Sequence, residues 1–388
     1  MIDDTYGPED WGWRHEFHAA WAAMSDPGPG GRPLAPARVT GRERHLYELV
    51  FPDFAGRAGF PDATGAAGSP RMARRIEGAS VSGRFEYEAR GPSDYPVTGD
   101  WVLVDPEEGG SRIHAALPRR TALSRGMAGD ETGEQVLAVN VDTLLLVFGL
   151  DGGRNFLVRL LERALVAARN SGASACVVLN KADLASAEDK ERAVAEASRA
   201  ASVPVIAVSA RTGEGLDELA AMLSPGETVG MLGKSGVGKS ALVNALGGGA
   251  ALAAEGANRD GDLRGRHTTT SSRLFRLGSG VLLIDGPGIR ELKLWGDVDG
   301  LEGGFPEIAE LAGGCRFADC SHSGEPGCAI REALESGAIE QSRYLAWLEL
   351  RRELTWLERR VDDKARREDE LRWKHIAKDQ KAMKKLRD

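Results

Sequence analysis

The hydrophobic pattern of the chain changes near residue 136. From Val136 onward, apolar runs alternate with amphipathic stretches, which is typical of a parallel sheet flanked by helices. The pattern predicts strands over residues 141–148, 175–179, 203–208, 228–232 and 281–284, and helices over 156–170, 187–201 and onward from Lys239. We therefore expect an α/β domain in the middle of the chain.

The segment before this domain has a different pattern. Short strand-like runs are separated by turns rich in Gly and Pro, and no long helical period is present. The strand-like runs cover residues 37–40, 45–50, 80–85 and 100–104. This pattern predicts a small antiparallel β-barrel, in which the Gly/Ala/Pro stretch at 59–70 forms a mobile loop.

Both ends of the chain carry helical patterns. Near the start, aromatic residues recur at roughly helical spacing before a Pro/Gly run, which predicts a short docking helix and a linker: Trp11, Trp13, Phe17 and Trp21. Near the end, a 3-4-3-4 spacing predicts a helix with one apolar face: Trp347, Leu350, Leu354, Leu357 and Val361. The last eighteen residues, 371–388, are strongly basic. We expect an extension (1–35), a barrel (36–130), an α/β domain (131–300) and a C-terminal domain with a basic helical tail (301–388).

Composition narrows the class of protein. The 388 residues are 42% hydrophobic and 28% charged, as in a globular protein of two or three domains. With 50 basic against 58 acidic residues the net charge is −8, so any contact with a polyanion must come from a local patch. Apolar runs fall far short of the roughly 20 residues of a membrane helix, and the acidic start is unlike a signal peptide. We expect a cytoplasmic protein with no membrane contact.

A phosphate-binding loop follows the strand expected at 228–232. The pattern G-x-x-x-x-G-K-S is complete and stands between a strand and a helix: Gly233, Lys234, Ser235, Gly236, Val237, Gly238, Lys239 and Ser240, followed by Ala241. In such a loop, backbone N–H groups bind phosphate oxygens, Lys239 reaches the β and γ phosphates, and the Ser240 hydroxyl binds magnesium. The alternative is a glycine-rich turn without a ligand.

Two further boxes indicate that the base is guanine. Asn180, Lys181, Ala182 and Asp183 follow the strand at 175–179 and resemble the guanine-recognition box of GTPases. The Asp183 carboxylate can accept hydrogen bonds from guanine N1–H and its exocyclic amine, which adenine lacks on that edge. Ser209 and Ala210, after the next strand, fit the remaining base-contacting box. By itself so short a box could be a chance loop, but together the boxes favour GTP over ATP.

Two switch segments complete the nucleotide site. Asp285 and Gly288 fit the D-x-x-G pattern, in which Asp285 holds magnesium through water and the Gly288 N–H faces the γ-phosphate. Upstream, Thr268 is the expected second hydroxyl on magnesium, with Thr269 as the close rival. His267 is the candidate for orienting the attacking water, although it could instead cap the loop or touch RNA. The Thr run could also be a plain surface loop.

The order of these boxes is permuted. In ordinary small GTPases the phosphate loop comes first, but here the base boxes at 180 and 209 precede the loop at 233. A sheet tolerates this rearrangement when its old termini lie close together and can be joined. The second switch then runs directly into the segment that follows it.

That segment contains a cluster of metal-binding residues. Cys315, Cys320, His322 and Cys328 supply three thiolates and one imidazole within fourteen residues. They form a full tetrahedral shell for zinc, which favours a structural site over a catalytic or redox one. Cys176, in an apolar strand, is expected in the core.

Taken together, these features resemble one bacterial family, the circularly permuted GTPases that depend on the small ribosomal subunit, known as RsgA. The resemblance covers about residues 36–360 and includes G-x-H-T-T, D-x-P-G and the Cys-His cluster ending in E-P-G-C. It implies an N-terminal OB-fold barrel, a central GTPase and a mostly helical zinc-binding domain. It also implies a monomer that binds GTP or GDP with Mg²⁺, holds one Zn²⁺, and acts on the small subunit and its rRNA late in maturation.

Three segments of the sequence depart from the family pattern, and two alternative functions are to be weighed against the one that the family implies. The extension before residue 36, the Gly/Ala/Pro insertion and the basic tail depart from the pattern. One alternative is a GTP-dependent RNA-binding module in which turnover is incidental. A signalling or membrane-linked GTPase is disfavoured, because the sequence carries no lipidation motif.

Overall fold

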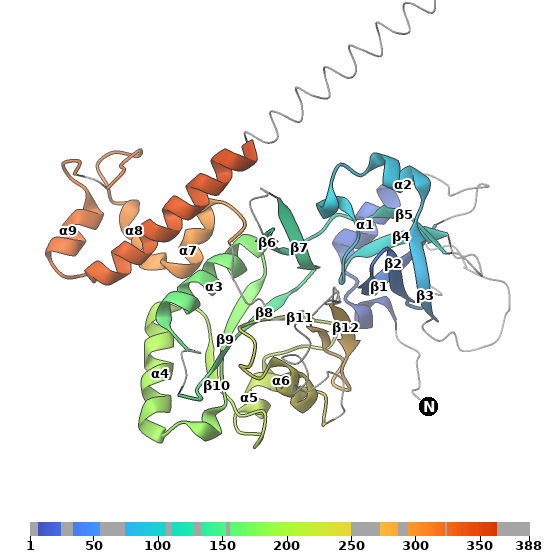
Figure 1. Ribbon diagram of the computed structural model, residues 1–388, viewed down its shortest axis with the longest axis horizontal. Coiled ribbons are helices and arrows are strands. Elements are labelled where there is room, and N and C mark those ends of the chain that lie inside the picture. The colour runs from blue at the N-terminus through green and yellow to red at the C-terminus, as the bar shows by residue number, and fades with distance from the viewer. Residues whose placement is uncertain are drawn as a thin grey trace, which may run out of the picture.

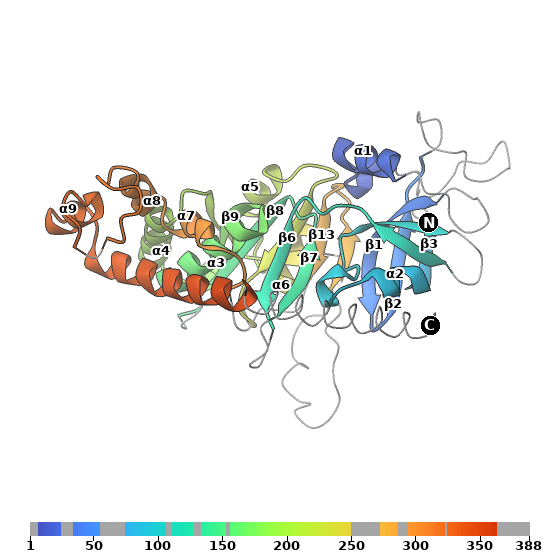
Figure 2. The same ribbon diagram turned by 90° about the horizontal axis from the view of Figure 1, so that it is seen from above.

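The computed structural model describes residues 7–24, 34–54, 74–105, 111–127, 133–152, 156–249, 272–285, 294–322 and 324–362. The loop expected at 59–70 and the basic tail at 371–388 lie outside these residues. The described parts form a row in which a barrel, a central α/β sheet and a helical part follow one another (Figures 1 and 2). None of the described helices is long and apolar enough to cross a membrane.

The central sheet has five parallel strands in the order β10-β9-β8-β11-β13. They are β8 (Thr143–Gly149), β9 (Ser174–Asn180), β10 (Val205–Ala207), β11 (Thr228–Leu232) and β13 (Leu282–Asp285). The antiparallel β12 (Arg273–Arg276), which the sequence pattern did not predict, lies beside β13. The helices are α3 (Val158–Ser171), α4 (Ala187–Ala200), α5 (Leu216–Ala221) and α6 (Lys239–Leu246), with a 3-10 turn, η4 (Ala182–Leu184), after β9.

Alternate residues of the parallel strands enter two separate cores, as the period of a strand requires. Leu144 and Leu146 pack in the cluster that contains α3 and α4, whereas Leu145 and Val147 pack in the cluster that contains α5 and α6. Cys176 belongs to the second cluster, and burial raises the pKa of its thiol to about 11. It is therefore a core residue, as expected.

The barrel has five strands, and the strands at the two ends of its sheet pair with each other. The strands are β1 (Ala35–Glu43), β2 (Leu46–Phe51), β3 (Arg74–Val81), β4 (Trp101–Asp105) and β5 (Arg112–Ala116). They pair in the order β1-β2-β3-β5-β4, and β4 returns to β1. An antiparallel barrel was expected, and every pairing is antiparallel except that of β3 with β5, which is parallel. The strand predicted at 80–85 ends at Val81, because Ser82 caps α2 (Gly83–Glu88) by accepting a hydrogen bond from the Phe85 N–H. A 3-10 turn, η3 (Pro92–Asp94), follows α2.

The barrel and the central sheet are hydrogen-bonded to each other. Gly41 of β1 pairs with Arg273 of β12, so that eleven strands form one continuous sheet. The Thr98 hydroxyl donates to the Ser272 carbonyl at 2.9 Å, and Arg273 pairs with Glu48 at 3.0 Å. The strand that follows the expected first switch therefore contacts the barrel directly.

The N-terminal extension also packs into this junction. The expected helix is present as α1 (His15–Ala23), after the 3-10 turn η1 (Pro8–Trp11). The Trp13 ring meets the Trp101 ring of β4 edge-on, with centroids 4.7 Å apart. Beneath it, the fully buried Arg38 donates to the carbonyl of Trp11 and to the hydroxyl of Thr228, and burial lowers its pKa to about 10. One side chain thus ties the extension, the barrel and the central sheet together.

A separate hairpin, β6 (Ala122–Gly126) and β7 (Glu134–Val139), connects the barrel to the central sheet. The domain boundary expected between residues 130 and 131 lies between its two strands.

The helical part consists of α7 (Leu301–Gly304), α8 (Pro306–Ala312), α9 (Ala329–Glu335) and a long helix over residues 341–362, preceded by the 3-10 turn η5 (Val298–Gly300). Trp347, Leu350, Leu354 and Leu357 of the long helix are buried, as their spacing predicted. The long helix docks on α3, where Arg163 binds Glu353 through two hydrogen bonds of 2.8 and 2.5 Å. Arg343 reaches Glu162 of α3 and Glu307 of α8. The helical part is therefore fixed to the α/β part by charged contacts as well as apolar ones.

Candidate nucleotide and metal sites

The boxes expected to bind the nucleotide lie at one edge of the central sheet. Asn180 ends β9, residue 233 follows β11, and Asp285 ends β13. Leu232 of β11 lies opposite Leu146 of β8, and the parallel strands are paired in register. The carboxyl ends of parallel strands form the usual ligand-binding edge of an open α/β sheet. The fold thus brings together boxes that lie far apart in the sequence.

The phosphate-binding loop is shaped by close backbone approaches. A Cβ atom at Gly233 would lie 2.4 Å from the Val147 carbonyl oxygen, and one at Gly238 would lie 2.3 Å from the Asn180 amide nitrogen. Gly238 also has a φ of +95°, which favours glycine. Lys239 is buried, and its ammonium donates to the carbonyls of Gly233 at 2.8 Å and Lys234 at 2.9 Å. The lysine is thus folded back over the loop, beside the place where phosphates bind in such loops.

Asn180 braces the loop from the side. Its amide nitrogen donates to the Val237 carbonyl at 2.9 Å, and its amide oxygen accepts from the Ala210 N–H at 3.2 Å. One buried side chain therefore links the phosphate-binding loop to both base boxes.

The Asp183 carboxylate is oriented by Ser209. The buried Ser209 hydroxyl donates to one carboxylate oxygen at 2.6 Å and accepts from the Thr212 N–H at 3.1 Å. The other carboxylate oxygen lies 3.9 Å from the guanidinium of Arg211, whose side chain is 82% exposed. This arrangement presents a fixed, negatively charged acceptor at the edge of the sheet.

Sequence reasoning missed one residue of this site, Asp151. Lys181 has a left-handed backbone, and its ammonium pairs with the Asp151 carboxylate at 2.5 Å. Asp151 comes two residues after β8, so the rule that located the other boxes, a polar residue at or just after the end of a buried parallel strand, would have found it. The pair holds the long Lys181 side chain in one place beside Asp183.

The expected magnesium ligands are only partly within the described residues. Ser240 is the second residue of α6 and Asp285 ends β13, and their hydroxyl and carboxylate oxygens are ligand types that Mg²⁺ prefers. Thr268, Thr269, His267 and Gly288 lie outside the described residues. The residues present therefore fit a magnesium ion bound together with a nucleotide.

The four expected zinc ligands come together. The ligand atoms of Cys315, Cys320, His322 and Cys328 all lie within 4.8 Å of one another. The His322 Nδ1 is 3.6 Å from the Cys315 sulfur and 3.5 Å from the Cys328 sulfur. Zn–S and Zn–N bonds of about 2.3 and 2.0 Å give separations of this size in a tetrahedron. Three sulfurs and one nitrogen fit Zn²⁺ and leave no open position.

The Cys/His cluster packs on the long helix. The His322 ring meets the Trp347 ring at 5.7 Å, and the Tyr344 hydroxyl donates to the His322 carbonyl at 3.3 Å. Burial lowers the pKa of His322, which favours the neutral imidazole that binds metals.

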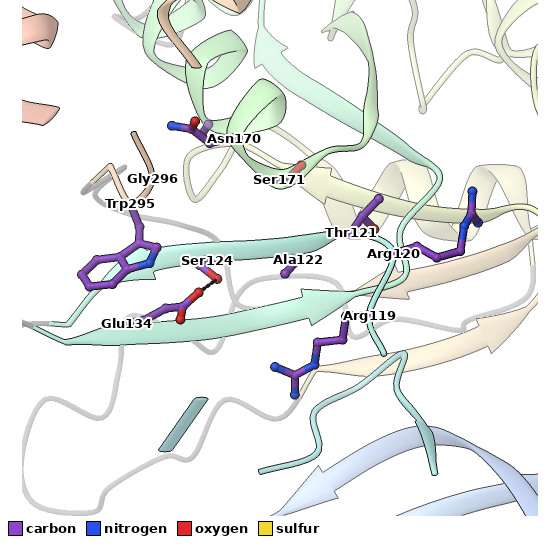
Figure 3. A pocket seen from close by; sticks show the side chains of 11 residues that line it. Arg119, Arg120, Thr121, Ala122, Ser124, Glu134, Asn170, Ser171, Trp295 and Gly296 are labelled. Atoms are coloured by element: carbon purple, nitrogen blue, oxygen red, sulfur yellow. Dashed lines mark hydrogen bonds between the residues drawn. The ribbon is translucent and has the colours of Figure 1, made fainter. Parts of the chain in front are cut away.

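A pocket of about 300 Å³ lies where the second switch leads into the helical part (Figure 3). It lies between the β6–β7 hairpin, the end of α3, and Trp295 and Gly296. A Cβ atom at Gly296 would lie 2.3 Å from the Asn170 amide, whose nitrogen donates to the Asp297 carbonyl at 3.4 Å. The chain leaving the second switch is thus held tightly against α3.

Comparison with known proteins identifies similar sequences. Residues 116–295 match the family model described as RsgA GTPase. A protein of Opitutus terrae named "Small ribosomal subunit biogenesis GTPase RsgA" is 45% identical over 325 residues, which cover 79% of this chain and 86% of that protein. A Methanosarcina acetivorans protein with the same name is 37% identical over 369 residues, covering 94% and 90%.

Solved structures share the fold. The crystal structure of YjeQ from Thermotoga maritima matches with a TM-score of 0.59 and 26% identity, covering 83% of this chain and 99% of that one. YloQ, described as a circularly permuted GTPase, matches with a TM-score of 0.56 and 23% identity over 85% and 98%. The multidomain, circularly permuted arrangement expected from the order of the boxes is confirmed.

Proposed function

Because this chain belongs to the RsgA GTPase family, we propose that it hydrolyses GTP to complete the maturation of the small ribosomal subunit. It binds the subunit and its rRNA through the barrel and the zinc-binding part, as a monomer in the cytoplasm, and leaves after hydrolysis. The observation that carries this proposal is the Asp183 carboxylate, held by the Ser209 hydroxyl at 2.6 Å at the edge of the sheet where the phosphate-binding loop begins. The names of the relatives support the choice of the small subunit.

The chain's own residues prepare the reaction in three ways. Backbone N–H groups of residues 233–238 bind phosphate oxygens, and Lys239 exchanges its two carbonyl partners for the β and γ phosphates. Asp183 reads the base, while Asn180 keeps the base boxes and the phosphate-binding loop in register. Ser240, Thr268 and Asp285 would hold Mg²⁺, which would supply neutralisation of the charge that develops on the phosphates.

The subunit itself should stimulate hydrolysis. The position after the D-x-x-G glycine is Ile289, which cannot orient water as a glutamine does in many GTPases, so hydrolysis by the free protein should be slow. We expect purified small subunits to raise the single-turnover rate about tenfold or more, within the range that partner-supplied activation provides. If subunits bind but never change the rate, the protein is instead a GTP-dependent RNA-binding module with incidental turnover.

We assign His267 the role of orienting the attacking water once the subunit closes the first switch. Its imidazole can orient water or accept its proton, unlike the side chain of Ile289. His267→Ala should keep GTP and subunit binding but lose most subunit-stimulated turnover. A mutant rate within about twofold of wild type on saturating subunits, under 0.5 kcal/mol of barrier, would remove His267 from the mechanism.

A further inference from the structure

The long helix over residues 341–362 carries both acidic and basic side chains. Three of its carboxylates are engaged with the α/β part and its connection. Glu349 pairs with Arg159 at 3.4 Å, Glu353 pairs with Arg163, and Glu358 accepts from the Val298 N–H at 2.9 Å. These carboxylates therefore already have partners, and Glu349 and Glu353 lie one turn from Arg352 and Trp356 on the helix surface.

The helix also carries an exposed tryptophan between arginines. Arg352, Trp356 and Arg360 are spaced four residues apart, so they lie in one row along the helix, and Arg359 adjoins that row. Trp356 is 55% exposed, and the guanidinium carbon of Arg360 lies 4.9 Å from its ring centroid. Among the described residues, no carboxylate pairs with these three arginines, although the exposed Asp362 follows within the same helix.

We propose that the row of Arg352, Trp356 and Arg360 binds unpaired RNA, with one nucleobase stacked on Trp356 and the arginines on the flanking phosphates. This inference rests on the proposed function, in which the RNA is that of the small subunit. Every base has a flat face, so stacking on an aromatic ring tolerates any sequence. Guanidinium groups suit phosphate, and the two arginines of the row are separated by about 12 Å along the helix.

The surroundings of Trp356 favour RNA over a protein or membrane partner. The other exposed large apolar side chain of the long helix, Leu345, is eleven residues away, about 16 Å along the axis. A protein or lipid surface would require apolar neighbours around the tryptophan, whereas a single ring flanked by cations matches a nucleotide. On a chain of net charge −8, this row is a local cationic patch of the kind a polyanion requires.

The site also has a fixed position relative to the nucleotide-binding part. Trp356 lies one turn from Glu353, whose two hydrogen bonds to Arg163 attach the helix to α3. A base stacked on Trp356 is therefore held at a set distance from the GTPase rather than on a swinging arm.

The test uses the full-length protein with a non-hydrolysable GTP analogue and a labelled single-stranded oligoadenylate, titrated by fluorescence anisotropy. Trp356→Ala should weaken binding about tenfold, within the range for loss of one stacked base. Trp356→Phe should keep most of the affinity, and Leu345→Ala, an exposed apolar truncation on the same helix, should have no effect. Arg352→Gln with Arg360→Gln should lower the slope of log affinity against log salt by about 1.4, two phosphates at roughly 0.7 each.

The outcomes separate this inference from the proposed function. Equal oligoadenylate affinity of wild type and Trp356→Ala, within twofold, overturns the stacking site even if subunits still stimulate both proteins. A loss as large for duplex RNA as for the single strand, or a loss in Trp356→Phe equal to that in Trp356→Ala, overturns it too. If stacking is lost in Trp356→Ala but wild-type turnover never responds to subunits, the inference stands and the proposed function fails. Basal GTPase activity should stay unchanged in every variant, because Trp356 lies outside the nucleotide site.

Discussion

Asp183→Asn should weaken GTP binding by about two to three orders of magnitude and shift the preference of the protein to xanthosine triphosphate. The Ser209 hydroxyl holds one carboxylate oxygen at 2.6 Å, so the replacement amide keeps its oxygen toward Ser209 and turns its NH₂ group toward the base. Guanine presents two hydrogen-bond donors on that edge, and in the variant they face the amide NH₂, which is also a donor. These buried donors then have no acceptor, at a cost of about 3–4 kcal/mol. Xanthine carries a carbonyl oxygen at the same place and accepts the new hydrogen bond.

Competition binding with fluorescent GDP against GTP, ATP and xanthosine triphosphate measures this change. Asp217→Asn is the matched control, because Asp217 is an exposed aspartate of α5 outside the base boxes. If Asp183→Asn retained an undiminished preference for guanine, Asp183 would not be the residue that reads the base.

Cys320→Ser should release the zinc and unfold residues 315–339 while nucleotide affinity stays within about twofold of wild type. A structural zinc site contributes roughly 10–16 kcal/mol to the folding of small metal-binding units, and a serine hydroxyl is a poor replacement for a thiolate. The seven-residue helix α9 and the loop before it are too short to remain folded without the metal. The long helix should stay docked, because Arg163–Glu353 and the Arg343 contacts hold it to α3 and α8.

Three measurements test whether the metal site and the nucleotide site are independent: metal content by mass spectrometry, limited proteolysis and GDP affinity. Cys176→Ser provides the control, since Cys176 is a buried core residue far from the metal-binding cluster in the sequence and should leave zinc content unchanged. Loss of nucleotide binding with zinc retained would show that the two sites are not independent.

The parts of the site that the sequence predicts are those written in short contiguous runs. The loop at 233–240 and the Asn180–Asp183 box each contain their own turn chemistry, and the buried strands before them are recognisable by composition alone. The zinc cluster was also predictable, because its four ligands lie within fourteen residues. Local signals are therefore enough to predict most of the candidate site.

What the sequence could not predict depends on residues brought together by the fold. Arg38 meets Thr228 across 190 positions, and Lys181 meets Asp151 across 30, so no local pattern marks either pair. Ser82 ended a strand that the composition of 80–85 favoured, because its hydroxyl caps a helix instead. The short β12 was not predicted because four residues carry little periodicity.

The pairing of Gly41 with Arg273 limits self-association of the protein through strand pairing. Without β1, β12 would be the outer strand of the central sheet, with unpaired N–H and C=O groups facing water. Such a strand is a template on which another chain can add its own strand, and natural proteins cover or blunt it. β1 pairs with β12 at Gly41 and Arg273, so the barrel covers this end of the strand from within the same polypeptide. A GTPase part without its barrel would expose this strand to pairing with another chain, a few residues after the expected first switch in the sequence.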